Sequence, residues 1–425
     1  MQAKKIFAIA AAAISSAVCA VEPSITDVTA RQLWPWSTDV DIAFTLSGTN
    51  SSVKFTAQYD GVEPFVLREH DLSGDFFEIE PGRHHVRWSP SRAGLSGDSL
   101  TNFRIVSAEP DTTDHTYLIL NLTDGSFSFA AEEPAGGWTS DPAYYQTNIV
   151  FRRIKAGSAT LGIPKAFFDN FFPDLNWGDI YGYSRPHNVT LTSDFYIGVF
   201  SVTKAQRYLA EQHLLGNTPD VSTYEAVIPD SGTSYNDLRG STADGIDWPN
   251  TKYEVKEGSV ISAFRSICAN TFPKGWIIDL PTTMQWEYAA RADTPTNQLW
   301  SVGGLATDSG ETITNCLDQI AIWAHNKDDY PQDLVGRKLP NKWGLYDMIG
   351  LCAQWNLDWY SNDPKYYRGT NPVGPASDRS SRRCRRGISR KNAFVQTAIP
   401  AVFGTNSATV ENHYRLCIHL KSLFD

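Results

Sequence analysis

The first part of the chain alternates short apolar runs with polar breaks, which is the pattern of a protein built from β-strands. Within residues 21–135, clusters of Gly, Asp, Asn and Pro separate runs rich in β-branched and aromatic residues. These runs are VDIAFTLSG, VKFTAQYDG, HHVRWSP, NFRIVSA and HTYLILNLTDGSFSF. Their length and spacing predict an all-β sandwich over 21–135. No set of side chains in it indicates catalysis, so we expect a module that docks, spaces or binds.

The second part of the chain has few helical patterns and many loops. A stretch containing Pro and Gly, residues 130–146, has no hydrophobic periodicity and predicts the boundary between two domains. Thr203 and Thr282 stand in N-cap positions of expected helices. The remainder predicts strands and long loops, including a surface excursion over 216–256. Apolar residues recur at helical spacing in three segments, which are 203–215, 257–272 and 282–292.

The extreme N-terminus has the features of a leader. Two lysines precede an apolar run over residues 6–18, which is shorter than the ~20 residues that a membrane helix needs. Ala20 offers a small residue for cleavage, and a lipid anchor on Cys19 is the alternative. We therefore expect a signal peptide over 1–20 and a secreted, periplasmic or cell-surface protein that does not span a membrane.

Length and charge narrow the classes of partner. The chain has 425 residues, which favours two domains of 21–135 and 136–425. It carries 37 Lys and Arg against 47 Asp and Glu, a formal net charge of −10. An acidic balance disfavours general binding to nucleic acid.

The cysteine count leaves one thiol over. Of the six cysteines, Cys19 lies in the leader, which leaves an odd number in the exported part. An odd count implies at least one thiol that is free or intermolecular. No Cys-x-x-Cys spacing occurs, so a structural zinc site is not expected.

Six stretches of the second part of the chain follow one another in a recognisable order. They are VFRRIKAGSATLG, RPHNVTLTSDFYIGVFSVTKAQ, LPTTMQWEYAARA, VGRKLPNKWGLYDMIGLCAQWNLDWY, NPVGPASDRSSRRCRRGIS and NHYRLCIHL. In this order they resemble the formylglycine-generating enzyme or sulfatase-modifying factor family. The resemblance covers about 150–425 and implies an α+β fold similar to a C-type lectin, with long loops around a small sheet. The β-sandwich would then be an N-terminal extension.

The resemblance also shows what the chain lacks. In the oxidases of this family, two cysteines near the end of the chain form a copper thiolate site that oxidises a substrate cysteine. Aligned on the Gly-Gly-Ser motif that ends here at Ser389, the two positions are Asn392 and Thr397, and no cysteine occurs in 385–416. Cu(I) selects soft thiolate ligands, which an amide or an alcohol does not replace. We therefore expect no catalytic residue at these positions and no copper.

Two other features of the family are altered. Where the family places Asn and Glu ligands of calcium, this chain has Leu351 and Gln354, after Gly350. Leu351 has no side-chain oxygen, so we predict a degenerate site, with weak calcium binding through backbone carbonyls left open. The resemblance also implies a disulfide between Cys268 and Cys417. Cys417 is one residue late for it, and one residue reverses the face of a strand.

A cluster of arginines interrupts the acidic chain. Arginine forks suit sulfate and carboxylate groups, so this cluster predicts a site for an anionic glycan or an acidic protein partner. A solvated face, neutralised by acidic neighbours, is the alternative. We also expect the ring of Trp355 to contact this ligand. The alternative is that Trp355 packs in the core. The arginines are Arg382, Arg383, Arg385, Arg386 and Arg390.

The sequence thus predicts a secreted member of this family without cysteine oxidase activity. We expect a binding module for a protein or an anionic glycan. Two alternatives stay open: an active oxidase or another enzyme in the same cleft, and a structural cell-surface protein. An iron site is not expected, because the chain has no matching histidine spacing.

Overall fold

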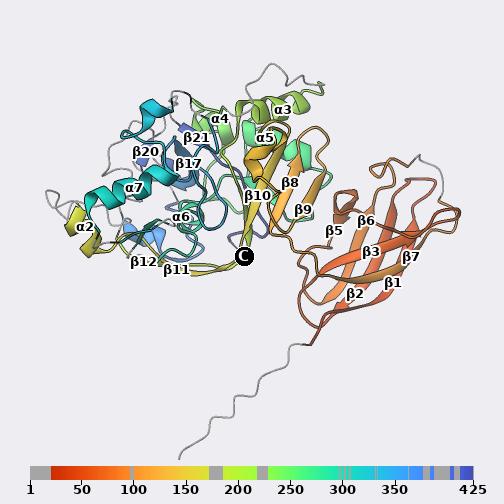
Figure 1. Cartoon of the computed structure of the whole chain (residues 1–425). Coiled ribbons are helices and arrows are strands. Elements are labelled where there is room, and N and C mark those ends of the chain that lie inside the picture. Colours follow the sequence, from red (N-terminus) through yellow and green to blue (C-terminus); the bar gives the residue numbers. More distant parts are fainter. Residues whose placement is uncertain are drawn as a thin grey trace, which may run out of the picture. The chain divides into compact units, whose positions relative to one another are not determined.

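A computed structural model describes most of the chain and divides it into two compact units (Figure 1). Among the described residues, the N-terminal unit comprises 21–67 and 74–112, and the C-terminal unit comprises 68–73 and 113–424. The described ranges are 21–95, 100–171, 185–217, 228–295, 298–300, 303–305, 308–330, 332, 334–361, 363–376, 383–386, 403–405 and 412–424.

The N-terminal unit consists of two antiparallel sheets, as predicted. One has the order β1-β2-β6-β5, from strands Ser24–Gln32, Val40–Ser47, Gly82–Trp88 and Leu72–Gly74, although Leu72 and Ser73 of β5 belong to the range 68–73 that is grouped with the C-terminal unit. The other has the order β4-β3-β7, from Phe65–Val66, Ser52–Gln58 and Arg104–Asp111. The rings of Phe44 on β2 and Phe55 on β3 lie 5.4 Å apart between the sheets. Alternate apolar residues thus form the core of a sandwich.

The predicted boundary near residue 135 is wrong. Strands β8 (Tyr117–Asn121) and β9 (Phe127–Ala130) were assigned to the sandwich, but β8 pairs with β10 (Asn148–Ile154) in the C-terminal unit. The segment expected to be a linker contains Trp138, which is buried against Tyr117 with ring centroids 5.0 Å apart. The units therefore divide at residues 112 and 113.

A six-stranded sheet organises the C-terminal unit and is buried on both faces. Its order is β14-β22-β13-β10-β8-β9, with β13 at Phe195–Gly198, β14 at Ile277–Asp279 and β22 at Cys417–His419. On β13, Tyr196 faces one apolar cluster while Phe195 and Ile197 face another. Successive side chains of a strand point to opposite faces, and both faces of this sheet are buried. For this reason the short strand has no polar residue.

Helices cover the two faces of this sheet (Figure 1). Helices α3 (Lys204–Leu214), α4 (Tyr235–Arg239) and α5 (Val260–Cys268) contribute to the Tyr196 side. Helices α6 (Thr283–Arg291) and α7 (Gly310–Ile320) contribute to the Phe195 side. The three predicted helices are confirmed as α3, α5 and α6, and Thr203 and Thr282 cap α3 and α6 through capping boxes.

The predicted surface excursion over 216–256 is wrong for residues 228–256. Tyr235, Trp248 and Tyr253 are almost completely buried in the core beside α5. These aromatic anchors hold a chain that has little regular structure.

The remaining elements form smaller sheets and short helices. A four-stranded sheet has the order β20-β19-β17-β21, from Phe403–Thr405, Arg383–Arg386, Ala353–Trp359 and Asn412–Tyr414. Strands β11 (Gly157–Leu161), β12 (His187–Leu191) and β18 (Gly369–Thr370) form another, and β15 (Gln298–Trp300) pairs with β16 (Gly303–Leu305). The short helices are α1 (Ala143–Gln146), α2 (Lys165–Phe171), η1 (Glu69–Asp71), η2 (Trp138–Ser140), η5 (Thr242–Asp244), η6 (Lys327–Asp329) and η7 (Pro364–Tyr367).

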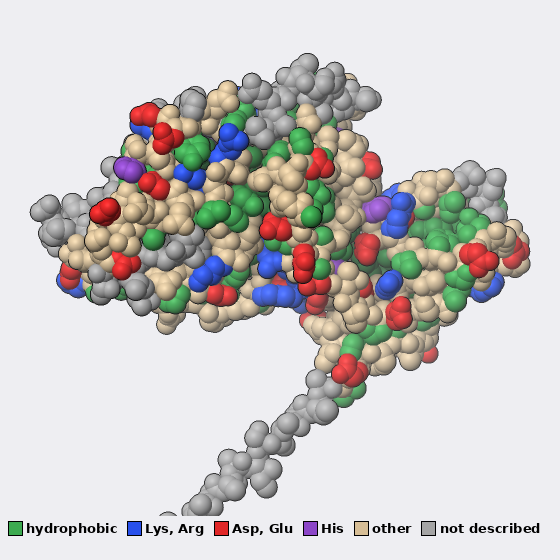
Figure 2. Space-filling view, in the orientation of Figure 1, with side chains coloured by type: hydrophobic (Ala, Val, Ile, Leu, Met, Phe, Trp, Pro, Cys, Tyr) green, Lys and Arg blue, Asp and Glu red, His purple; other side chains and the backbone are tan. Residues whose placement is uncertain are grey.

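Two properties of the structure concern membranes and nucleic acid. In the described part of the chain, no helix is long and apolar enough to cross a membrane. Figure 2 shows acidic and basic side chains interspersed on the visible face, without a broad field of one sign. A mixed surface of this kind does not attract a polyanion such as nucleic acid over its whole area.

Candidate binding site around strand β17

Strand β17 carries polar side chains on one face and aromatic ones on the other, although all seven of its residues are buried. Gln354 and Asp358 contact helix α6 through hydrogen bonds. Trp355 and Leu357 pack in the core that contains Tyr235 and Trp248. A period of two therefore places Gln354, Asn356 and Asp358 together on the α6 side. We call these three residues the polar face of β17.

Trp355 lies in the core. Its side chain has no exposed surface, and its indole N–H donates a hydrogen bond of 2.7 Å to the carbonyl oxygen of Thr233. A ligand at the surface cannot contact it. This position does not fit the ligand-binding role that the sequence suggested for Trp355. It fits the alternative, in which Trp355 packs in the core.

Asp358 stabilises the start of helix α6. Its Oδ2 accepts a hydrogen bond of 2.6 Å from the backbone N–H of Thr283, in the first turn of the helix. A carboxylate at this end interacts favourably with the helix dipole. The pairing explains how a charged residue is retained in a fully buried strand.

Asn356 is a buried polar group to which the described residues give no hydrogen bond. It lies between Gln354 and Asp358 on β17, and its side chain has no exposed surface. Neither its amide nitrogen nor its amide oxygen has a hydrogen-bond partner among the described residues. Buried amides normally form hydrogen bonds, so Asn356 is an exception within this part of the chain.

Arg415 occupies the place where a cation site was predicted. Its Nε donates to Oε1 of Gln354 at 3.2 Å, and its other nitrogens donate to the carbonyl oxygens of Gly198 and Tyr346. Burial lowers the pKa of Arg415 to about 10, which leaves it charged at neutral pH. Gln354 Oε1 also accepts from Trp286. The oxygens are thus already bonded to a positive charge, and a second cation beside it would be repelled.

The other two residues of the predicted calcium site offer no better ligands. Leu351 packs its side chain in an apolar cluster with Phe200 and Tyr346. The carbonyl oxygen of Gly350 accepts a hydrogen bond from the N–H of Cys352. Calcium needs several free oxygen ligands with negative charge, so this set does not fit it. In the described part of the chain, no group of three or more His, Cys, Asp or Glu residues could hold a metal ion.

Asp347 is a buried acid beside this network. Its backbone has a positive φ of 53°, which is uncommon for a residue with a side chain. Its Oδ2 accepts a hydrogen bond of 2.7 Å from the N–H of Gly336. Burial raises the pKa of Asp347 from 3.8 to about 6, against the opposing effects of this hydrogen bond and of Arg415.

The structure brings part of the arginine cluster next to β17. Strand β19 pairs antiparallel with β17, and its register places Arg386 opposite Gln354, Arg385 opposite Trp355 and Arg383 opposite Trp359. We call Arg383, Arg385 and Arg386 the arginine strand. The other predicted site residues, Arg382, Ser389, Arg390, Asn392 and Thr397, lie outside the described residues.

The predicted disulfide between Cys268 and Cys417 is wrong, because both cysteines are free. Cys268 ends helix α5 on one face of the six-stranded sheet, in the cluster that also holds Leu416 and Ile418. Cys417 faces the opposite side and packs in the other cluster. The shift of one residue along β22 has therefore turned the thiol away from its expected partner. Burial raises the pKa of both thiols, which makes them unreactive.

The described cysteines do not fit a copper thiolate site. Cys352 packs in a third apolar cluster, Cys316 lies on helix α7 and Cys384 lies on β19. The chain between β19 and β21, residues 387–411, contains no cysteine. A pair of thiolates that could hold Cu(I) is thus not provided by these residues.

Sequence reasoning missed the buried polar residues of this site. Asn356, Asp358, Asp347 and Arg415 were not singled out, because a single sequence does not show which polar residues are buried. The alternation of polar and aromatic residues in QWNLDW was the available signal, since it predicts a strand with two different faces.

Comparisons with known proteins agree on the kind of domain. A family model described as "Sulfatase-modifying factor enzyme 1-like domain" matches residues 144–413. The chain is 29% identical over 100 residues to the formylglycine-generating enzyme of Mus musculus, a match that covers 23% of this chain and 27% of the relative. For the enzyme of Bos taurus the values are 28% over 103 residues, 23% and 26%. The chain thus matches about a quarter of the length of these relatives.

Two solved structures match part of this chain. Treponema denticola variable protein 1 is 21% identical, with a TM-score of 0.40, and the match covers 64% of this chain and 95% of that one. PvdO from Pseudomonas aeruginosa is 16% identical, with a TM-score of 0.45 and coverage of 64% and 94%.

Proposed function

The chain belongs to the sulfatase-modifying factor enzyme 1-like family, and from this premise we propose that it is a binding protein that does not oxidise cysteine to formylglycine. Its ligand is an anionic glycan or an acidic protein surface. The binding face is formed by the arginine strand and the chain that follows it.

The observation that carries the proposal is the absence of cysteine from one segment. Strands β19 and β21 lie on either side of β17 in the same sheet, so the chain between them starts and ends beside the polar face of β17. This segment holds Asn392 and Thr397 where the resemblance places the catalytic thiols, and it contains no cysteine. Without thiolates, the copper-dependent oxidation has no ligand for its metal.

The arginine strand supports the choice of an anionic ligand. Three of the four residues of β19 are arginines, in a chain with a formal net charge of −10. A planar guanidinium forms bidentate hydrogen bonds with sulfate and carboxylate groups. A local positive strand on an acidic protein attracts such groups while the rest of the surface repels nonspecific polyanions.

The oxidase activity can be tested directly. The purified protein is incubated with Cu(I), oxygen and a peptide that contains the cysteine of a sulfatase motif, and mass spectrometry is used to look for the aldehyde. An active formylglycine-generating enzyme serves as the positive control. We expect no aldehyde, and its formation would show that the chain is an oxidase after all.

Ligand binding is tested on an array of sulfated, uronic and neutral glycans, together with acidic protein ligands. We expect sulfated glycans or acidic protein ligands to be retained and the Arg385→Ala/Arg386→Ala variant to lose them. The control is Arg83→Ala/Arg87→Ala, which removes the same charge from exposed positions on β6. Equal retention by all three proteins contradicts the proposal, and retention of no ligand favours a structural cell-surface protein.

Export is part of the same proposal. The basic and apolar start of the chain supports cleavage after Ala20. Expression of the full chain in a bacterium, followed by fractionation and mass measurement of its N-terminus, tests this. A protein that stays in the cytoplasm with Met1 in place contradicts it.

A further inference from the structure

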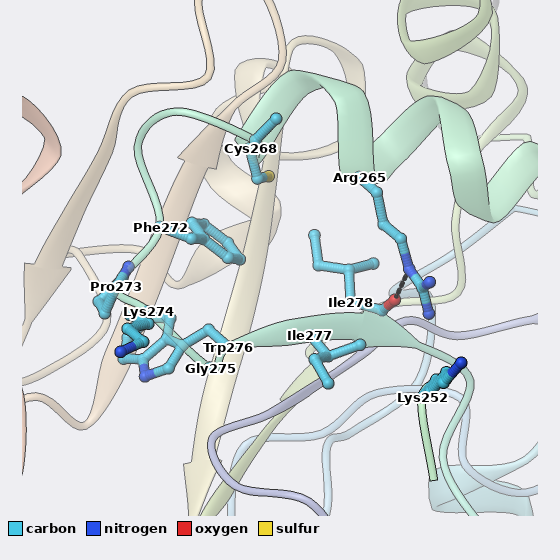
Figure 3. Close-up of a pocket in the computed structure, with 11 residues that line it drawn as sticks. Lys252, Arg265, Cys268, Phe272, Pro273, Lys274, Gly275, Trp276, Ile277 and Ile278 are labelled. Carbon is cyan, nitrogen blue, oxygen red and sulfur yellow. Dashed lines mark hydrogen bonds between the residues drawn. The ribbon is translucent and has the colours of Figure 1, made fainter. Parts of the chain in front are cut away.

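A pocket lies at the edge of the six-stranded sheet, away from β17. It is bounded by the end of helix α5, the loop 269–276 and strand β14 (Figure 3). Its volume is about 420 Å³, within the range of roughly 300–1,000 Å³ that is usual for small-ligand sites. The residues that line it are Lys252, Arg265 and residues within 268–278, a set different from the residues proposed above to bind a ligand.

The aromatic wall of the pocket is held in place before any ligand arrives. The ring of Trp276 lies 5.4 Å from Phe272, 6.1 Å from Phe127 and 5.9 Å from Tyr196, measured between ring centroids. Trp276 and Phe272 both remain partly exposed, so part of each ring is open to solvent. A rigid aromatic surface costs little conformational entropy when it binds a ligand.

The charged side chains that line the pocket are all cationic. Lys274 lies beside Trp276 at one end, and Lys252 and Arg265 lie at the other end (Figure 3). Arg265 is fixed by hydrogen bonds to the carbonyl oxygens of Ile278 and Tyr253 and to the carboxylate of Asp279, which balances its charge. The two lysines are exposed, and Lys252 forms an ion pair of 3.8 Å with Glu254, whose side chain is also exposed. An exposed pair of this kind contributes little, so both ammonium groups can still bind an anion.

We infer that this pocket binds a short acidic carbohydrate. The face of one uronic acid ring lies against Trp276, and the carboxylates of the carbohydrate lie on Lys252 and Lys274. The apolar face of a sugar ring suits an aromatic surface, while its hydroxyl rim suits the open, partly polar mouth. Ammonium groups attract carboxylates as point charges and steer them to the pocket of a protein whose formal net charge is −10. A wholly apolar ligand would make no use of the two lysines.

Isothermal titration calorimetry of the full mature chain tests the inference with trigalacturonate as the probe. Neutral trigalactose tests the need for charge, and benzoate tests whether any ring with a carboxylate suffices. We expect trigalacturonate to bind with a stoichiometry of one, more weakly at higher salt, and trigalactose not to bind. Equal binding of the neutral sugar, or tighter binding of benzoate, overturns the choice of an acidic carbohydrate.

Variants assign the binding to the pocket. The Lys252→Glu/Lys274→Glu variant should weaken trigalacturonate at least about 10-fold, because both positions then repel the carboxylate. Trp276→Phe keeps an aromatic ring against its neighbours and should weaken binding several-fold. Lys342→Glu, at an exposed position that does not line the pocket, is the matched control and should leave the affinity within about twofold.

The outcome is separable from the test of the arginine strand. The Arg385→Ala/Arg386→Ala variant should bind trigalacturonate in the pocket as the unmodified chain does. If it loses the probe while the double lysine variant keeps it, the sugar binds at the arginine strand and the pocket inference is overturned. Failure of every protein to bind trigalacturonate overturns it as well, without bearing on the acidic protein ligand proposed for the arginine strand.

Discussion

The Nε atom of Arg415 donates a hydrogen bond to Oε1 of Gln354 over 3.2 Å, and neither residue has any exposed surface. The same guanidinium donates to the carbonyl oxygens of Gly198, at the end of β13, and Tyr346, in the loop before β17. One buried cation therefore joins the six-stranded sheet to the sheet that contains β17. This relationship accounts for several properties of the site.

Replacing Arg415 should destabilise the C-terminal unit strongly. Arg415→Leu removes this donor from two buried carbonyl oxygens and one of the two donors to Oε1 of Gln354, which costs about 3–5 kcal/mol in the free energy of unfolding. Arg415→Lys should recover only part of this, because one ammonium group cannot reproduce the fork geometry. Urea unfolding measures both, with the exposed Arg83→Leu as control. A loss below about 1 kcal/mol for Arg415→Leu would show that the guanidinium does not join the sheets.

Calcium should not stabilise the protein. The guanidinium of Arg415 already bonds the oxygens of Gln354, Gly198 and Tyr346, and it repels a second cation. A ligand that binds only the folded state raises the midpoint of thermal unfolding, so the measurement is a melting curve with millimolar calcium and another with a chelator. We expect the two curves to coincide. A higher midpoint with calcium would indicate ligands that this geometry does not include.

Two buried groups should give stability opposite dependences on pH. Burial raises the pKa of Asp347 to about 6, so its contribution is full at low pH and is lost as pH rises through 6. Burial lowers the pKa of His419 from 6.5 to about 4, despite the nearby Asp279, so its contribution is full above 6.5 and is lost as pH falls through 4. The two effects oppose each other between about pH 4 and 6.5.

Single variants should separate these effects. Asp347→Asn keeps an acceptor for the N–H of Gly336 and leaves the effect of His419, so the free energy of unfolding should rise with pH across the window. His419→Gln leaves the effect of Asp347, and the free energy should fall with pH. Denaturant unfolding at several pH values measures both slopes. Identical slopes in the two variants would mean that other groups control the pH dependence.

Much of the local structure could be predicted from the sequence. Helices α3 and α6 were predicted because Thr203 and Thr282 stand at N-caps before residues with helical spacing. The boundary was missed because a strand pattern does not state its partner. Strand β8 looks like the strands before it, yet it pairs with β10, beyond Trp138 in the sequence. Pairing over such a separation depends on tertiary packing, which local patterns do not encode.

The site was harder to predict than the fold. That Asn392 and Thr397 stand where the resemblance places the catalytic cysteines could be read from the residue types, since a copper site needs thiolates. The burial of Asn356 and the position of Arg415 could not be predicted from the sequence, because both depend on which sheets pack together. The resemblance suggested a disulfide at Cys417, and the period of two along β22 was the better guide.

The thiols of Cys268 and Cys417 should be reduced and protected. Both are buried on opposite faces of one sheet, so neither can reach the other without unfolding. Alkylation without a reducing agent should modify both residues in denatured protein and neither in folded protein, while the partly exposed Cys316 reacts in both. Peptide mass spectrometry reads the result. A peptide pair that joins Cys268 to Cys417 before reduction would contradict the structure.

Trp355 should contribute to stability through both its size and its indole N–H. Trp355→Phe removes the hydrogen bond to the carbonyl oxygen of Thr233 and leaves a cavity beside Tyr235, whose ring centroid lies 6.2 Å away. Together these changes should lower the free energy of unfolding by about 2–4 kcal/mol.

The matched control for this prediction is Trp36→Phe. Trp36 is 87% exposed in the N-terminal unit, so its replacement should change stability by less than about 0.5 kcal/mol. Because Trp355 and Trp36 lie in different compact units, calorimetry should show that Trp355→Phe lowers an unfolding transition that Trp36→Phe leaves unchanged. If Trp355→Phe is neutral in stability and instead weakens an anionic ligand, the indole acts in binding, and the position of Trp355 in the core does not describe its role.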